Sequence, residues 1–326
     1  MENIKWGIIG VGDVCELKSG PGFQNAPGSE LVAVMRRDAG KAQDFAKRHG
    51  VPKSSGNADE LLNDPEINAI YIATPPVYHL GYAKRALAAG KHVYLEKPFA
   101  LNADEARQIQ VADEASPQKL CVAHYRRRLP LFMRIDELLS SGQLGKVRHV
   151  SLQLIQPEKD PLIASSEQNW RVDPSVSGGG IFNDLAPHQL DLLLMYFGTP
   201  EVIQGFSLQR NPEGTCDDCV SGQMRFTDDV LFQGHWDFTS QDGTVKDSCK
   251  ITCDQGTISF SFFRSPTLVV KSNQGIETTT FDPPRHIQQP MIETVVSYFQ
   301  GTDENPCPSS VGVQVMEMID SFISSK

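Results

Sequence analysis

Concentrated basic segments and long apolar segments are both scarce in this 326-residue sequence, and each scarcity excludes a class of function. The 30 Lys and Arg residues are outnumbered by 40 Asp and Glu residues, and no basic run stands out except Arg126-Arg127-Arg128. Phosphate binding needs a concentrated positive surface, so a nucleic-acid partner is not expected. No segment approaches the length of a membrane span, and the N-terminal residues lack the apolar core of a signal peptide. We therefore expect a cytoplasmic protein without a membrane partner.

Cysteine is also sparse, with seven residues spread along the chain. An odd number without a sign of export fits reduced thiols better than a disulfide framework. One grouping, Cys216-x-x-Cys219 with Cys249-x-x-x-Cys253, has four thiols that could hold a structural zinc ion. The alternative is that Cys249, Ile251 and Cys253 alternate along a strand as small apolar side chains on one face. Because the cysteine spacing is loose, we favour this second interpretation and predict no metal site.

The first part of the chain alternates short apolar runs with amphipathic helical segments. This rhythm is typical of a parallel sheet with helices on both faces, in which strands that are buried on both sides appear as continuous apolar runs. The sequence thus predicts a Rossmann-like, doubly wound α/β domain over residues 1–123. The predicted strands are Ile4 to Ile9, Leu31 to Met35, Ala69 to Ala73, His92 to Leu95 and Leu120 to Ala123, and the helices are Ala39 to His49, Val77 to Ala89 and Ala103 to Ala115.

After Pro130 the pattern changes to one of short strands separated by turn signals. A helix is expected from Leu131 to Ser140 and another from Asn183 to Tyr196, while short turns between residues 201 and 281 predict antiparallel pairing. The predicted second domain, residues 124–326, is of the α+β class with a large, mostly antiparallel open sheet. Helical segments from Pro290 to Phe299 and from Ser309 to Ile323 close the chain, and the C-terminal helix is a candidate to pack back on the first domain.

Two glycines follow the first predicted strand. Gly10 and Gly12 would permit a tight turn in which backbone N–H groups approach a pyrophosphate at the start of a helix, with Asp13 and Val14 next in the turn. Cys15 stands where the fingerprint has its third glycine, although it is small enough for close helix packing. The alternative is a plain strand-to-helix turn. We predict a dinucleotide site because the motif follows the first strand.

The residues after the second strand bear on cofactor choice. An acidic residue at this point would bind the adenosine ribose, but the first polar residues are Arg36 and Arg37. A guanidinium suits a 2′-phosphate, so we predict that NADP(H) is preferred and that NAD(H) is possible. In the alternative interpretation, both arginines are solvated and Asp38 binds the ribose.

Further motifs lie at the ends of later strands and in the second half. The third apolar run ends in Thr74-Pro75-Pro76 and is followed by Tyr78 and His79, and the next run ends in Glu96-Lys97-Pro98. The second half contains Trp170-Arg171, the triplet Gly178-Gly179-Gly180 and Asp184-x-x-x-His188-x-x-Asp191. With these motifs the sequence resembles, over nearly its whole length, the glucose-fructose oxidoreductase, inositol dehydrogenase and rhizopine-catabolism family (Gfo/Idh/MocA).

The resemblance implies a role for each matching residue. Lys97 matches a lysine that touches the nicotinamide ribose and the substrate hydroxyl, with Glu96 and Pro98 setting its position and a cis peptide bond expected before Pro98. Asp184 and His188 match the pair that completes the site from the second domain. Residues at the cofactor are Thr74, Pro75, His79, Trp170 and Arg171. Apart from the resemblance, Tyr125 and Arg126 are expected to face the substrate because they lie just past the last parallel strand. The alternatives are that Trp170 is a core residue and that the basic triplet is a solvated turn.

The resemblance and the residue types together predict reversible hydride transfer between a nicotinamide and a carbinol carbon of a sugar, cyclitol or related polyol. His188 is the expected general acid or base, Lys97 the group that stabilises an alkoxide, and Asp184, one helical turn before His188, the residue that holds the imidazole tautomer. Two alternatives stay open, namely an NAD-dependent glycoside hydrolase and a non-catalytic sensor. By family analogy the second-domain sheet would form a homodimer or homotetramer.

Overall fold

The computed structural model describes residues 3–162, 170–241 and 244–323. The chain divides into two compact units, each with its own sheet. Unit 1 comprises Met1–Tyr125 and Pro284–Met316, and unit 2 comprises Arg126–Pro283 and Glu317–Lys326. The first unit is therefore made from two separate stretches of sequence. Among the described residues, every helix is too short or too polar to cross a membrane.

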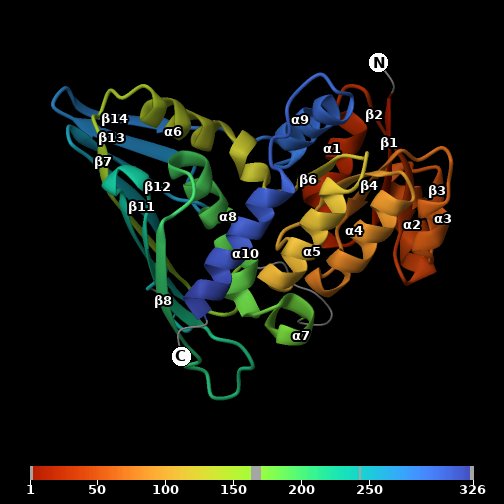
Figure 1. Cartoon of the computed structure of the whole chain (residues 1–326), viewed down its shortest axis with the longest axis horizontal. Coiled ribbons are helices and arrows are strands. Elements are labelled where there is room, and N and C mark those ends of the chain that lie inside the picture. The colour runs from red at the N-terminus through yellow and green to blue at the C-terminus, as the bar shows by residue number, and fades with distance from the viewer. Residues whose placement is uncertain (1–2, 163–169, 242–243, 324–326) are drawn as a thin grey trace. The chain divides into compact units, whose positions relative to one another are not determined.

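The sheet of unit 1 is entirely parallel and has the strand order β3-β2-β1-β4-β5-β6. This arrangement confirms the predicted doubly wound sheet (Figure 1). β1 and β5 have the predicted bounds, whereas the short strand β3 was not predicted. The strands are β1 (Ile4–Ile9), β2 (Ser29–Met35), β3 (Lys53–Ser55), β4 (Ala69–Ile72), β5 (His92–Leu95) and β6 (Leu120–Val122).

The helices of unit 1 come from both stretches of its sequence. Asp38 caps the start of α2 by accepting a hydrogen bond from Lys41 N, and Gly50 ends it at a φ of 65°. A methyl group on Gly22 of α1 would lie 2.7 Å from Ile292 Cδ1, so the late helix α9 packs closely on the first α-helix. The elements are η1 (Cys15–Ser19), α1 (Gly20–Asn25), α2 (Ala39–His49), α3 (Ala58–Leu62), η2 (Pro76–Tyr78), α4 (His79–Ala88), α5 (Ala103–Glu114), α9 (Gln289–Phe299) and the greater part of α10 (Ser309–Ile323).

Large aromatic side chains fill the core of unit 1. Trp6, Phe23, Tyr71 and Tyr94 are each fully buried. The ring centroids of Phe23 and Tyr71 are 4.9 Å apart, and those of Tyr71 and Tyr94 are 5.3 Å apart in a stacked pair. Such rings bury a large apolar area, and their packing favours one fixed arrangement of the strands beneath the site.

The sheet of unit 2 has eight strands in the order β14-β13-β12-β11-β7-β10-β9-β8. Among the strand pairs of the described residues, only β7–β10 is parallel, which confirms the predicted mostly antiparallel sheet. The strands are β7 (Val147–Ile155), β8 (Val202–Leu208), β9 (Cys219–Arg225), β10 (Leu231–Asp237), β11 (Lys246–Cys253), β12 (Gly256–Phe260), β13 (Thr267–Ser272) and β14 (Gly275–Thr280).

Helices cover one face of this sheet and leave the other face open (Figure 1). On the covered face, Trp236 of β10 donates a hydrogen bond to Gln189 Oε1 of α8, and Phe322 near the end of α10 lies against Gly222. On the open face Phe206 of β8 is 73% exposed. The helical elements of unit 2 are η3 (Tyr125–Arg128), α6 (Pro130–Ser140), η4 (Trp170–Val172), α7 (Pro174–Ser177), α8 (Gly180–Phe197) and η5 (Thr227–Asp229).

Cys15, Cys216, Cys219, Cys249 and Cys253 are free thiols. Cys249, Ile251 and Cys253 are buried on one face of β11, which confirms their interpretation as small apolar side chains of a strand. In the described part of the chain, the four cysteines considered above do not gather into one cluster of possible metal ligands. The zinc interpretation of that grouping is therefore wrong.

Candidate functional site

The turn after β1 has the geometry of a nucleotide-binding loop. Gly10 has a φ of 100°, and a methyl group there would lie 2.8 Å from Thr74 Cγ2 and 2.9 Å from the carbonyl carbon of Ala73. Only glycine fits this position, because a side chain would meet both strain and a clash. A methyl group on Gly12 would meet no atom closer than Gly10 O at 3.9 Å, so the space beside Gly12 is open. A ligand can therefore approach the backbone there.

The helical segment that follows begins at Asp13 and becomes a π-helix at η1. The N–H of Gly20 bonds to Cys15 O, five residues earlier, and Pro21 next to it has no N–H to continue an α-helical pattern. Gly20 is needed because a Cβ there would lie 2.3 Å from Cys15 O. Burial raises the pKa of the Cys15 thiol to about 12, so Cys15 is a neutral packing residue behind the turn.

Two guanidinium groups lie at the carboxyl end of β2. Arg36 is half-buried, and Arg37 donates a hydrogen bond to Tyr78 Oη at 3.2 Å with its guanidinium 5.3 Å from the Tyr78 ring centre. Asp38 already accepts a hydrogen bond from Lys41 N as the cap of α2. One oxygen of the Asp38 carboxylate is therefore used for capping, although the alternative interpretation assigned this carboxylate to the ribose.

Thr74 and His79 lie at the carboxyl end of β4, on either side of Pro75. His79 is buried, with Nε2 2.8 Å from Thr74 O and Nδ1 3.3 Å from Phe99 O. Burial lowers the pKa of His79 to about 4, so the ring is neutral near pH 7 and donates only one of these bonds. His79 thus ties the loop after β4 to the loop after β5. The Thr74 hydroxyl is buried and has no hydrogen-bond partner among the described residues.

Lys97 follows β5, and its backbone is held by Glu96. The buried Glu96 carboxylate accepts hydrogen bonds from Lys97 N at 3.0 Å, from Tyr71 Oη at 2.5 Å and from Gln288 Nε2 at 2.9 Å. The Lys97–Pro98 peptide bond is cis, as expected. The half-buried Lys97 is therefore fixed at the carboxyl edge of the parallel sheet by a carboxylate that is itself bonded on three sides.

These features of unit 1 fit a dinucleotide. The strand order reverses between β1 and β4, and ligands of open parallel sheets bind outside the carboxyl ends of the strands at such a point. The open space beside Gly12 suits a pyrophosphate, and the unpartnered Thr74 hydroxyl suits a polar ligand.

In unit 2, Asp184 and His188 lie on successive turns of α8, as predicted. Asp184 Oδ2 accepts a hydrogen bond from Nε of the buried Arg171 at 3.1 Å, and the Arg171 guanidinium lies 4.4 Å from the half-buried Trp170 ring. His188 is 5% exposed and lies edge-on to Phe263, with ring centroids 5.9 Å apart. Arg171, predicted at the cofactor, thus holds the carboxylate of the Asp184-x-x-x-His188 pair in place.

The basic triplet is not a solvated turn, so that alternative is wrong. Arg126 is buried, donates a hydrogen bond to Phe262 O at 2.5 Å and places its guanidinium 4.5 Å from the Phe263 ring centre. Arg127 forms a buried ion pair with Asp191 of α8, with N–O distances of 2.8 and 3.1 Å. Tyr125 is also buried. The sequence-based predictions missed this ion pair, although Asp191 on the same helix as His188 was the available signal.

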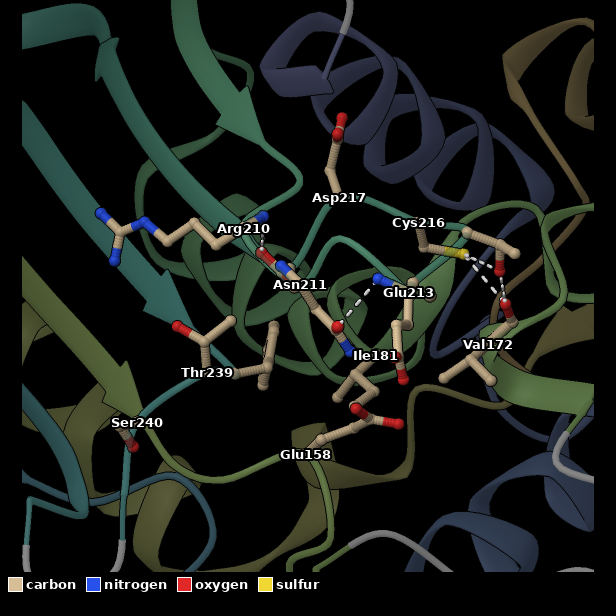
Figure 2. Close-up of a pocket in the computed structure, with 15 residues that line it drawn as sticks. Glu158, Val172, Ile181, Arg210, Asn211, Glu213, Cys216, Asp217, Thr239 and Ser240 are labelled. Carbon is tan, nitrogen blue, oxygen red and sulfur yellow. Dashed lines mark hydrogen bonds between the residues drawn. The ribbon is translucent and has the colours of Figure 1, made fainter.

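Unit 2 also contains a cavity of about 630 Å³ at the first turn of α8. Figure 2 shows Glu158 and Glu213 reaching toward each other from two separate segments, whereas Arg210 and Asp217 point away from them. Ile181 of α8 and Phe238 contribute apolar surface. The sequence indicated only a turn at residues 211–214, because nothing local signals that this turn meets α8.

Comparison with known proteins decides the family. The sequence pattern described as an oxidoreductase family with an NAD-binding Rossmann fold matches residues 4–124, and that of the GFO/IDH/MocA C-terminal domain matches residues 132–259. The chain belongs to the Gfo/Idh/MocA oxidoreductase family. This membership confirms the predicted family and makes the protein an oxidoreductase with an NAD-binding fold.

Two curated relatives and one solved structure illustrate the family. Oxidoreductase P35 of Formosa agariphila is 47% identical over 319 residues, which cover 98% of each chain. The 1,5-anhydro-D-fructose reductase of Ensifer adhaerens is 28% identical over 240 residues, which cover 73% of this chain and 70% of the relative. A levoglucosan dehydrogenase structure with NADH and levoglucosan superposes with a TM-score of 0.85 at 21% identity, covering 98% of this chain and 96% of the other. This Gfo/Idh/MocA protein thus shares its fold along nearly its whole length.

Proposed function

We propose that the protein transfers a hydride reversibly between a nicotinamide cofactor and a carbinol or carbonyl carbon of a sugar, cyclitol or related polyol. The observation that carries this proposal is the anchoring of Lys97 by the buried Glu96 at the same sheet edge as the Gly10–Gly12 turn. This bond holds the Lys97 backbone at the sheet edge where ligands of this fold bind, and a lysine ammonium there would stabilise negative charge on a ligand. The relationship to a 1,5-anhydro-D-fructose reductase supports a sugar-like substrate.

In this proposal the chain's own residues manage the substrate oxygen. The nicotinamide, when bound, accepts or delivers the hydride. Lys97 donates a hydrogen bond to the substrate oxygen and stabilises negative charge on it. His188 takes or gives the proton of that oxygen as general base or acid. Asp184, held by Arg171, keeps a negative charge one turn before His188, which favours an orientation of the imidazole that donates toward the carboxylate side.

We further propose that NADP(H) is the preferred cofactor. Arg36 and Arg37 stand at the end of β2, where the adenosine ribose of a dinucleotide lies in this fold. Asp38 caps α2 with one carboxylate oxygen, which makes it a poorer partner for ribose hydroxyls than an uncommitted carboxylate. A guanidinium at this position suits a 2′-phosphate.

The open face of the unit 2 sheet is our proposed surface for a homodimer or homotetramer. Phe206, Leu208 and Leu231 on its strands are 73%, 57% and 52% exposed. They lie among polar side chains, as in protein interfaces that bury a central apolar patch. Sedimentation equilibrium should report a dimer or larger assembly, and Phe206→Glu should shift it toward the monomer.

The proposed activity is tested by following the absorbance of reduced nicotinamide across a panel of aldoses, cyclitols, anhydrosugars and simple polyols with each cofactor. On the best substrate, Lys97→Met and His188→Ala should each lower turnover by about two to four orders of magnitude. Lys84→Met, which removes an exposed lysine of α4, serves as the control and should leave turnover unchanged. Turnover that survives the loss of Lys97 would remove this lysine from the mechanism. Cleavage of a glycoside without net change in the cofactor would instead favour the hydrolase alternative.

A further inference from the structure

A cluster of possible metal ligands lies on the open face of the unit 2 sheet, on strands β9 and β10. Cys219 of β9 is directly opposite Asp237 of β10, and His235 precedes Asp237 by two residues, so all three side chains share one face. A sulfur, a ring nitrogen and a carboxylate oxygen from these residues lie within 4.8 Å of one another. Because β9 and β10 are flanked by β8 and β7, the backbone that carries these groups is fixed on both sides.

The outer contacts of the cluster are those that orient metal ligands in proteins. His235 Nδ1 lies 2.8 Å from Ser221 Oγ, a contact that leaves Nε2 for coordination. Asp237 Oδ1 accepts hydrogen bonds from Thr239 N at 2.9 Å and from Thr239 Oγ1 at 2.7 Å, whereas Oδ2 contacts Arg210. A metal-ligating histidine usually donates its other N–H to an acceptor, and ligating carboxylates are in turn hydrogen-bonded.

The Arg210 guanidinium already contacts one of the possible metal ligands. Arg210 Nη1 lies 2.8 Å from Asp237 Oδ2, while half of the Arg210 side chain is exposed. The Asp237 carboxylate is therefore paired with a long, half-exposed side chain that a metal ion would have to displace.

We propose that Cys219, His235 and Asp237 bind a divalent transition-metal ion, with zinc as the preferred ion. Thiolate, imidazole and carboxylate are the ligand types of protein zinc sites, and three protein ligands leave a coordination position for water. On binding, the Cys219 thiol releases one proton to solvent, and the Arg210 guanidinium leaves Asp237. Small side-chain rotations close the distances among the three groups to those of a coordinated ion. The three proposed ligands are not residues of the proposed hydride transfer, and the metal proposal does not depend on that activity.

Cobalt(II) provides the test, because a cobalt–thiolate bond gives a charge-transfer band in the near ultraviolet and a tetrahedral site gives intense visible bands. Titration of the metal-free full-length protein with cobalt chloride should produce both signals, and zinc chloride should abolish them. Cys219→Ser should lose the charge-transfer band, whereas Cys216→Ser, which removes a half-buried thiol outside the cluster, should keep it. Far-UV circular dichroism of each variant checks that it is folded.

Two further variants make the result decisive. Arg210→Ala removes the competing cation and should tighten cobalt binding by about tenfold, since a charge-assisted hydrogen bond no longer has to be broken. His235→Gln should weaken binding without altering the fold. The absence of a charge-transfer band in the wild-type protein, or its persistence in folded Cys219→Ser, would overturn the proposal and leave a hydrogen-bonded polar patch.

Discussion

Two stacked tyrosines in the core of unit 1, Tyr71 and Tyr94, allow the free energy of the hydrogen bond between Tyr71 and Glu96 to be measured. Tyr71 and Tyr94 are both fully buried, on neighbouring strands. The Tyr71 hydroxyl donates to Glu96 Oε1 at 2.5 Å, whereas the Tyr94 hydroxyl has no hydrogen-bond partner among the described residues. Replacing either residue by phenylalanine removes one oxygen and keeps the ring. The two substitutions therefore change shape equally, but only Tyr71→Phe removes a hydrogen bond to Glu96.

The expected free energies follow from these contacts. A hydrogen bond to a charged group contributes roughly 1.5–3 kcal/mol, so Tyr71→Phe should lower the free energy of unfolding by about 2 kcal/mol. Glu96 would keep its bonds from Lys97 N and Gln288 Nε2, which limits the loss. A buried polar group without a partner costs about 1–3 kcal/mol, so Tyr94→Phe should be neutral or stabilising.

Native-state hydrogen exchange is the suitable assay, because it follows the amides of β4 and β5 in unit 1 separately from unit 2. Slowly exchanging amides of these strands should lose protection in Tyr71→Phe and keep or gain it in Tyr94→Phe. Urea unfolding should show the same order of midpoints with an unchanged m-value. Equal losses in the two variants would refute the reasoning, since the ring and not the hydroxyl bond would then carry the effect.

Three further perturbations test other contacts. Arg36→Ala should raise the NADPH dissociation constant by about tenfold with little change for NADH, as measured by fluorescence titration of both cofactors. Asp191→Asn should lower the free energy of urea unfolding by about 3 kcal/mol, because it removes the carboxylate charge that pairs with the Arg127 guanidinium where both side chains are largely buried. Glu16 has its pKa lowered from 4.5 to about 2, chiefly by the Arg48 hydrogen bonds. Its contribution to stability is thus complete above pH 4.5 and lost as the pH falls toward about 2, and Glu16→Gln should flatten the urea midpoint over that interval.

The strands of unit 1 were predictable because most are buried on both faces. β1 and β5 are continuous apolar runs, and the predicted bounds agree with the structure. β3 escaped prediction because Lys53, Ser54 and Ser55 form a short polar strand at the edge of the sheet. The π-helix after the glycine turn also escaped, since it depends on the close approach of Gly20 to Cys15 O and on Pro21.

Candidate site residues could be predicted where they belong to a short local motif. Their hydrogen-bond partners could not be predicted where these lie far away in the sequence. Lys97 and the Asp184–His188 spacing were visible in local motifs. The bond from Gln288 to Glu96 joins residues 192 positions apart, and that from Arg126 to Phe262 joins residues 136 apart. No local pattern indicates such pairs, because they arise only when separate elements pack.

The composition of unit 1 from two stretches of sequence affects its biosynthesis. Residues 1–125 leave the ribosome before the segment 284–316 that completes the unit. During this interval α1 cannot pack on α9, and Glu96 cannot accept its hydrogen bond from Gln288. Domains otherwise tend to fold as they emerge, from the N-terminus onward. Residues 1–125 therefore carry an uncovered apolar surface until the segment 284–316 has been synthesised, and this is the stage at which chaperone contact would be most needed.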